Sequence, residues 1–144
     1  MKGIYGLIVH AQGEVAVGRC GQLVVDGFCV YVGSAQGPGG LSRRVARHRA
    51  VLSGATPTRH WHIDYLLGIS ARVDAIGAAT SDPQAECALA RELAQHHPLG
   101  LDGFGASDCR CPSHLFRFSS GDPEPLARAL QALGWEPVPL LDHR

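Results

Sequence analysis

The sequence contains no asparagine, a single lysine (Lys2) and no long apolar run. No apolar segment approaches the roughly 20 residues that a membrane-spanning helix requires, so we expect no association with a membrane. The apolar run of residues 3–9 is too short for the core of a secretory signal peptide, and no small-residue cleavage site accompanies it. These absences predict a cytoplasmic protein.

The cysteine content excludes a disulfide-stabilised scaffold. Five cysteines are an odd number, and a chain of 144 residues that is 45% hydrophobic can form a core without crosslinks. We therefore expect reduced thiols, with Cys20, Cys29 and Cys87 as buried apolar side chains. Charged residues make up 18% of the sequence, which is typical of a folded globular protein and not of a disordered chain.

The formal net charge is zero, but the cations are concentrated in one segment. Residues 43–62 contain five arginines, three histidines and no acidic residue, whereas the acids gather in residues 74–92 and 122–142. Every cation except Lys2 is an arginine, whose planar guanidinium group matches phosphate. A basic face on an otherwise neutral protein indicates a nucleic acid partner bound at one site.

Apolar periodicity predicts a mixed α/β (α+β) fold. Segments rich in Ile, Val, Leu and aromatic residues are expected as strands, and they comprise residues 3–10, 28–33, 72–79 and 114–118. Residues 14–17 and 22–25 predict a β-hairpin extension between the first two strands. Segments with apolar residues three or four apart are expected as helices, and they comprise residues 41–52, a short piece within 60–67, 81–97 and 124–133.

Helix boundaries carry their own signals. Ser81 is expected to cap the helix that begins there, because a proline follows in the first turn and a glutamine stands three residues after the serine. Gly134 is expected to end the last helix. Residues 99–113 are expected to form a loop. We expect one domain over residues 1–144, with a core of residues 3–118 and a C-terminal helix and tail at 119–144.

A tyrosine stands at one end of each of the first two predicted strands, in Gly3-Ile4-Tyr5 and Tyr31-Val32-Gly33. The second strand leads through a Gly/Pro turn into a helix that carries Arg44 and His48, four residues apart and therefore on one face. Phenol hydroxyls beside guanidinium groups are suited to binding a phosphodiester.

Taken together and in their order along the chain, these motifs resemble those of the GIY-YIG nuclease superfamily. The resemblance covers residues 3–118 and is to the Uri-type branch of small stand-alone proteins. The residues that carry the resemblance are Gly3-Ile4-Tyr5, Tyr31-Val32-Gly33-Ser34, Leu41 with Arg44 and His48, and Glu86 on a helix after a third strand. Residues 59–65 and 103–111 resemble signatures of that branch.

The resemblance implies a small antiparallel sheet of three core strands flanked by helices, and cleavage of DNA with one Mg²⁺ or Mn²⁺ ion. It leaves open whether the DNA is single- or double-stranded, and RNA is an alternative substrate. The catalytic residues that it implies are Tyr5, Tyr31, Arg44, His48 and Glu86, with Glu86 as the metal-binding carboxylate. A tyrosine with an ordinary pKa of about 10 is a poor base at neutral pH. We therefore expect Arg44 and the cation to stabilise a phenolate at Tyr5 or Tyr31, assisted by His48.

The chain departs from the family pattern in three ways. The two tyrosines lie farther apart in the sequence than in a typical member, and the predicted hairpin extension accounts for the extra residues. Ser34 occupies a position at which some relatives have a lysine. No asparagine follows Glu86, and we expect Ser107 and Asp108 of the 99–113 loop to support the metal site in its place.

Several further side chains are expected to border the nucleic-acid groove or to brace the site, and they are Ser34, Arg43, Arg47, His60, Trp61, His62 and Asp64. The string His60-x-His62-x-Asp64 leaves open a binuclear metallo-hydrolase, although a tyrosine stands where such sites usually continue with histidine. Cys109, Cys111 and His114 leave open a zinc site, although the spacing offers no firm fourth ligand. A nucleic-acid-binding module with little or no cleavage activity is the alternative function.

Overall fold

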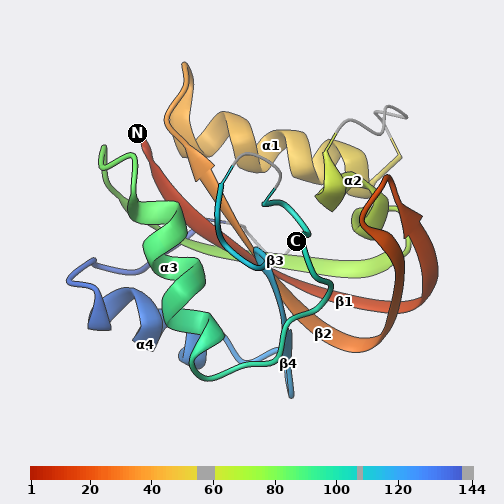
Figure 1. Ribbon diagram of the computed structural model, residues 1–144. Coiled ribbons are helices and arrows are strands. Elements are labelled where there is room, and N and C mark those ends of the chain that lie inside the picture. Colours follow the sequence, from red (N-terminus) through yellow and green to blue (C-terminus); the bar gives the residue numbers. More distant parts are fainter. Residues whose placement is uncertain (55–60, 107–108, 141–144) are drawn as a thin grey trace.

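The computed structural model describes residues 1–54, 61–106 and 109–140 (Figure 1). These residues form a five-stranded antiparallel sheet in the order β4-β2-β1-β3-β5. The strands are β1 (Gly3–Val17), β2 (Gly21–Ala35), β3 (Ser70–Ala79), β4 (Leu115–Phe118) and β5 (Val138–Pro139). The helices are α1 (Gly40–Leu52), α2 (His62–Leu67), α3 (Ala85–Ala94) and α4 (Glu124–Ala132). The α/β class predicted from the sequence, an antiparallel sheet flanked by helices, is therefore confirmed.

Strands β1 and β2 form one long hairpin at the centre of the sheet. Their register runs without interruption from the pair Gly3–Ala35 to the pair Val17–Gly21. The predicted hairpin extension is thus confirmed, and it continues the two motif strands directly. The additional residues lie at the turn end of the hairpin, away from Tyr5 and its neighbours, so they lengthen the sheet without separating the tyrosines.

Helices cover both faces of the sheet (Figure 1). Helices α1 and α2 pack on the face that carries Leu7 and Val9 of β1. Helices α3 and α4 pack on the face that carries Ile4 and Ile8. Because both faces are covered, residues 3–9 of β1 are all buried, which explains why this segment is a continuous apolar run and does not alternate.

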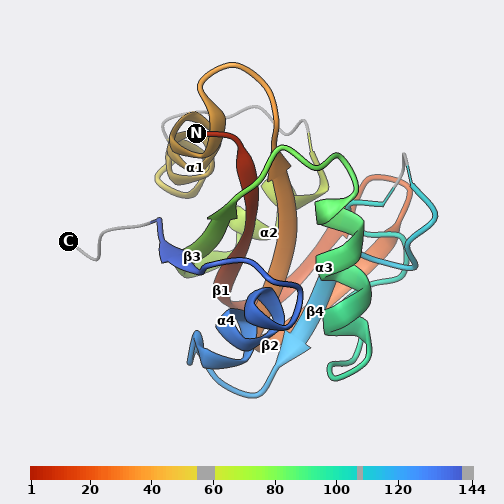
Figure 2. The ribbon, with the colours of Figure 1, turned by 90° about the vertical axis from the view of Figure 1, so that its left-hand side faces the viewer.

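The outer strands complete the sheet on either side of the hairpin (Figure 2). Strand β3 pairs with β1, and the four residues of β4 pair with residues 28–31 of β2. The two-residue strand β5, which pairs with β3 at the pairs Ile76–Pro139 and Gly77–Val138, was not predicted. A strand of this length is too short to show a periodicity of two, so local sequence carries no signal for it.

The predicted start of α3 is wrong. Ser81 does not cap the helix, which begins at Ala85 with Gln84 as its N-cap residue and no capping side chain. The carboxylate of Asp82 accepts a hydrogen bond from the backbone N–H of Gln84 at 2.8 Å, and this local turn replaces the expected capping box. Glu86 consequently lies in the first turn of α3.

Within the described ranges, no helix has both the length and the apolar character needed to span a membrane.

Candidate active site

The two motif tyrosines are neighbours on the sheet face that α1 and α2 cover. Tyr5 pairs with Gly33 and Leu7 pairs with Tyr31, so the tyrosines are diagonal neighbours on one face of the hairpin. Their ring centroids are 6.5 Å apart. Gly33 makes this arrangement fit, because a Cβ atom at that position would overlap the end of the Tyr5 ring.

His48 makes the closest polar contact with Tyr5. It lies on the buried side of α1, and its Nε2 atom is 2.7 Å from the Tyr5 hydroxyl oxygen. Both side chains are 1% exposed. Burial, together with the positive charges of Arg47 and Arg44, lowers the pKa of His48 to about 4, although Asp64 opposes the shift. The imidazole is therefore neutral at neutral pH, and its Nε2 atom can accept a hydrogen bond from the phenol hydroxyl.

Charged side chains on α1 and α3 affect the pKa of Tyr5. Burial raises the pKa of Tyr5 well above its ordinary value, and the charges of Tyr31 and Glu86 raise it further. Arg44 on α1 lowers the pKa through its charge and a side-chain hydrogen bond. Of the residues that the resemblance marks as catalytic, the structure thus brings Tyr5, Tyr31, Arg44 and His48 into contact, whereas Glu86 acts on Tyr5 through its charge.

A groove lined by arginines opens at the start of α1. It has a volume of about 550 Å³, and Arg43, Arg44, Arg47 and Trp61 line it together with the turn that precedes α1. The guanidinium carbons of Arg44 and Arg47 lie 4.4 and 3.9 Å from the centroid of the Trp61 ring. These cation–π contacts hold the positive charges at one rim of the groove, where they can bind phosphate oxygens.

Arg47, which lines the groove, is held in place by Asp64. Asp64 is 0% exposed, and its two oxygens accept hydrogen bonds from the two terminal nitrogens of Arg47 at 2.8 Å each. Asp64 Oδ2 also accepts the backbone N–H of Trp61 at 2.9 Å, which fixes the start of α2. These contacts are those of a bracing pair, and the nucleic-acid contact that was also expected for Arg47 stays a prediction.

His62, the first residue of α2, contacts the 99–113 loop. Its Nδ1 atom accepts the backbone N–H of Gly105 at 2.8 Å, and its ring packs on Phe104 with centroids 5.6 Å apart. Cys20, expected to be fully buried, is half-buried, and its Sγ atom lies 3.6 Å from His62 Nδ1. His62 and the carboxylate oxygens of Asp64 are thus engaged in separate protein contacts, and nothing in these contacts favours the binuclear site considered for this string.

Glu86 lies beside a cluster of sulfur and nitrogen ligands. The Sγ atoms of Cys87, Cys109 and Cys111 and a ring nitrogen of His114 lie within 4.8 Å of one another. The expectation that Cys87 is an isolated buried apolar residue is wrong, because it is half-buried and belongs to this cluster. Burial and the neighbouring thiols raise the pKa of Cys111 to about 12.

Sequence reasoning missed this fourth ligand because Cys87 belongs to α3, far along the chain from Cys109 and Cys111. It also missed Gly105, which lies between the ring of Tyr31 and the Cβ atom of His114. In the sequence, Cys87 is distinguished only by its position next to Glu86. That position does not indicate how far Cys87 lies from Cys109 and Cys111 in space.

The remaining predicted residues lie elsewhere. Ser34 pairs with Ile4, so strand alternation directs its side chain to the sheet face opposite the tyrosines. The predictions for His60, Ser107 and Asp108 fall outside the described residues.

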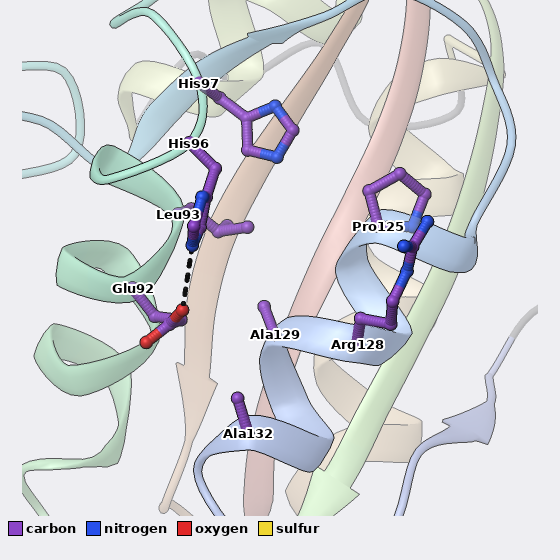
Figure 3. Close-up of a pocket in the computed structure, with 8 residues that line it drawn as sticks. All are labelled: Glu92, Leu93, His96, His97, Pro125, Arg128, Ala129 and Ala132. Atoms are coloured by element: carbon purple, nitrogen blue, oxygen red, sulfur yellow. Dashed lines mark hydrogen bonds and ion pairs between the residues drawn. The ribbon is translucent and has the colours of Figure 1, made fainter.

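A second hollow lies between α3 and α4 (Figure 3). Its lining includes His96 and His97 at the end of α3 and Arg128 of α4, and Glu92 and His96 contact each other at 3.3 Å. Its apolar wall, Leu93 and Ala129, belongs to the core on the opposite side of the sheet from the tyrosines. This hollow is therefore separate from the candidate active site.

Comparison with known proteins gives one match. No curated protein and no solved structure matches the chain significantly. The family described as "Domain of unknown function DUF123" matches residues 4–134, a range that includes both tyrosines, all four helices and the cysteine cluster. Because the match covers most of the chain, this protein belongs to the DUF123 family.

Proposed function

We propose that this protein is a metal-dependent endonuclease that hydrolyses phosphodiester bonds in DNA, as its resemblance to Uri-type GIY-YIG nucleases implies. The observation that carries the proposal is the hydrogen bond between Tyr5 and the neutral, buried His48, beside Tyr31 and Arg44. A core tyrosine needs one hydrogen-bond partner, but it does not need a second phenol and a guanidinium group at the same place.

The contacts of the two tyrosines favour one of them as the acceptor of the proton from the attacking water. As a phenolate stabilised by the positive charge of Arg44, Tyr5 would accept a proton from the attacking water, and His48 Nε2 would keep the Tyr5 oxygen in place by hydrogen bonding to it. Arg44, which contacts Tyr5 and lines the groove, neutralises charge on the phosphoryl oxygens. The hydrogen bond to His48 favours Tyr5 over Tyr31 as the proton acceptor, a choice that the sequence leaves open.

Glu86 has the chemistry to hold the divalent cation. Its side chain is 28% exposed, its charge acts on Tyr5, and its hard carboxylate oxygens suit Mg²⁺ or Mn²⁺. In the described residues the only group of three or more candidate ligands is the cysteine cluster, so Glu86 would be the sole protein ligand and water and substrate oxygens would complete the coordination. A cation bound there supplies positive charge for the phosphoryl and leaving oxygens.

The arginine-lined groove at the start of α1 supports a nucleic acid partner. Its arginines present planar guanidinium groups, and two of them, Arg44 and Arg47, lie over the ring of the half-buried Trp61. DNA is the proposed substrate, and RNA is the alternative. The five cysteines form no disulfide, which supports the proposed cytoplasmic location.

The test is cleavage of single- and double-stranded DNA and RNA by purified protein with Mg²⁺, Mn²⁺ or EDTA. We expect products only with a divalent cation, and Glu86→Gln should lower the rate by about 100-fold or more. The matched control is Glu92→Gln, because Glu92 lies on the same helix but faces the hollow between α3 and α4. Binding without metal-dependent products at protein excess would replace the nuclease by the nucleic-acid-binding module.

A further inference from the structure

The cluster of Cys87, Cys109, Cys111 and His114 takes no part in the proposed chemistry. Its members come from three places, namely the first turn of α3, the 99–113 loop and the residue before β4. A hydrophobic core would not gather three thiols and an imidazole around one point, because such groups gain little by packing against one another. The four ligand atoms converge instead as the donors of a soft metal ion do.

The distances fit a tetrahedral ion. Ligands at about 2.3 Å from Zn²⁺ for sulfur and about 2.0 Å for nitrogen are separated from each other by about 3.5–3.8 Å. Cys109 Sγ and His114 Nε2 are 3.5 Å apart, and all four ligand atoms lie within 4.8 Å of one another. The four ligand atoms would have to move closer together by less than the length of one metal–ligand bond to coordinate the ion.

The surroundings of the cluster also match those of a zinc site. His114 is 0% exposed, and while its Nε2 atom faces Cys109, its Nδ1 atom lies 3.7 Å from Oε2 of Glu86. In zinc proteins a carboxylate commonly accepts a hydrogen bond from the far nitrogen of a ligating histidine, and Glu86 lies on that side of the ring, just beyond hydrogen-bond distance. The three cysteines are half-buried, and an open hollow borders all three, which provides an entry path for the ion.

We infer that this protein binds one structural Zn²⁺ ion through the Sγ atoms of Cys87, Cys109 and Cys111 and Nε2 of His114. Four protein ligands leave no position for substrate, so the ion has a structural role and is distinct from the cation at Glu86. It crosslinks the 99–113 loop to the start of α3. The crosslink holds Gly105 against Tyr31 and Glu86 beside His114, so the zinc site supports the active site without entering the reaction.

The first measurement is metal content. Untagged protein, purified with a thiol reductant and without chelator, should contain about one zinc per chain by elemental mass spectrometry. Replacing zinc by Co²⁺ should produce the absorption of a tetrahedral cobalt–thiolate centre. Protein that retains no zinc after saturation and gel filtration, iron in place of zinc, or an octahedral cobalt spectrum would each overturn the assignment.

Two cysteine variants locate the site. Cys111→Ser should lose at least about ten-fold in zinc affinity, whereas the matched control Cys20→Ser, also half-buried but outside the cluster, should bind zinc normally. Equal losses in both variants would contradict the ligand set. If Cys111→Ser does not fold, the cobalt spectrum of the unaltered protein still decides.

Trypsin provides a readout of the crosslink. Arg110 is exposed between two of the ligands, so removal of zinc by a chelator should increase cleavage after Arg110 several-fold, and added zinc should reverse the increase. Unchanged cleavage would refute the structural role. None of these measurements uses a nuclease assay, so failure of the zinc site and failure of the proposed function are distinguishable.

Discussion

The neutral, buried His48 makes a quantitative prediction about stability in acid. Its pKa is about 4 in the folded protein and 6.5 in an unfolded chain, so the unfolded state binds a proton first as the pH falls. The stability contributed by the neutral imidazole is therefore complete above about pH 6.5 and is lost as the pH falls toward 4. The difference between the two pKa values corresponds to a total decrease of about 3 kcal/mol in the free energy of unfolding. About 2 kcal/mol of this decrease has occurred at pH 5.

The assay is urea unfolding at a series of pH values, for the unaltered protein and for His48→Gln. Glutamine can accept the hydrogen bond from Tyr5 but does not titrate, and the groups that face His48, namely Arg44, Arg47 and Asp64, are common to both proteins. Between pH 7 and pH 5 the unaltered protein should lose about 2 kcal/mol more free energy of unfolding than the variant.

A second variant controls for histidine content. His96→Gln, at a histidine whose side chain is 62% exposed and lies outside the candidate site, is the reference against which the effect of His48→Gln is compared. The reasoning would be refuted if His48→Gln and the unaltered protein lost stability in parallel. That result would mean that His48 is protonated as readily in the folded protein as in the unfolded chain, and that it is not the neutral partner of Tyr5.

Two further substitutions test the packing of the site. Arg47→Met leaves the buried carboxylate of Asp64 without its bidentate partner and should lower the free energy of unfolding by about 3 kcal/mol in urea titrations at neutral pH; an unchanged midpoint would show that solvent replaces the arginine. Gly33→Ala places a methyl group against the Tyr5 ring and should cost about 1–3 kcal/mol of stability and most of the cleavage activity. The same change at Gly37, where a Cβ atom would meet open space, should leave the stability unchanged, and an equal loss of stability would contradict the contact.

Local sequence determined much of the fold. The apolar runs of β1 and β2, the three-to-four-residue spacing of α1 and the glycine after α4 depend on side chains that are neighbours in the chain, so the elements could be predicted close to their observed bounds. The start of α3 was wrong because the Asp82 turn and a capping box at Ser81 share the same local residues, and only packing decides between them.

The site was predictable only in part. Tyr5, Tyr31, Arg44, His48 and Glu86 could be named because an ordered motif marks them, whereas which of them touch depends on strand register and on how α1 lies on the sheet. The bond between Tyr5 and His48 joins residues 43 positions apart, and no periodicity encodes it. The ion pair between Arg47 and Asp64 also joins residues that are distant in the sequence. Interpreting His60-x-His62-x-Asp64 as metal ligands does not predict this pair.

The sequence by itself therefore determined which residue types are present and which elements carry them, including the arginine-rich helix and the cysteines of the 99–113 loop. Only the tertiary structure decided that Cys87 joins Cys109, Cys111 and His114, and that His48 is neutral at the hydroxyl of Tyr5. The physical reason is that metal coordination and pKa shifts depend on distance and burial. Both are set by the packing of α1 and α3 against the sheet, and neither depends on separation along the chain.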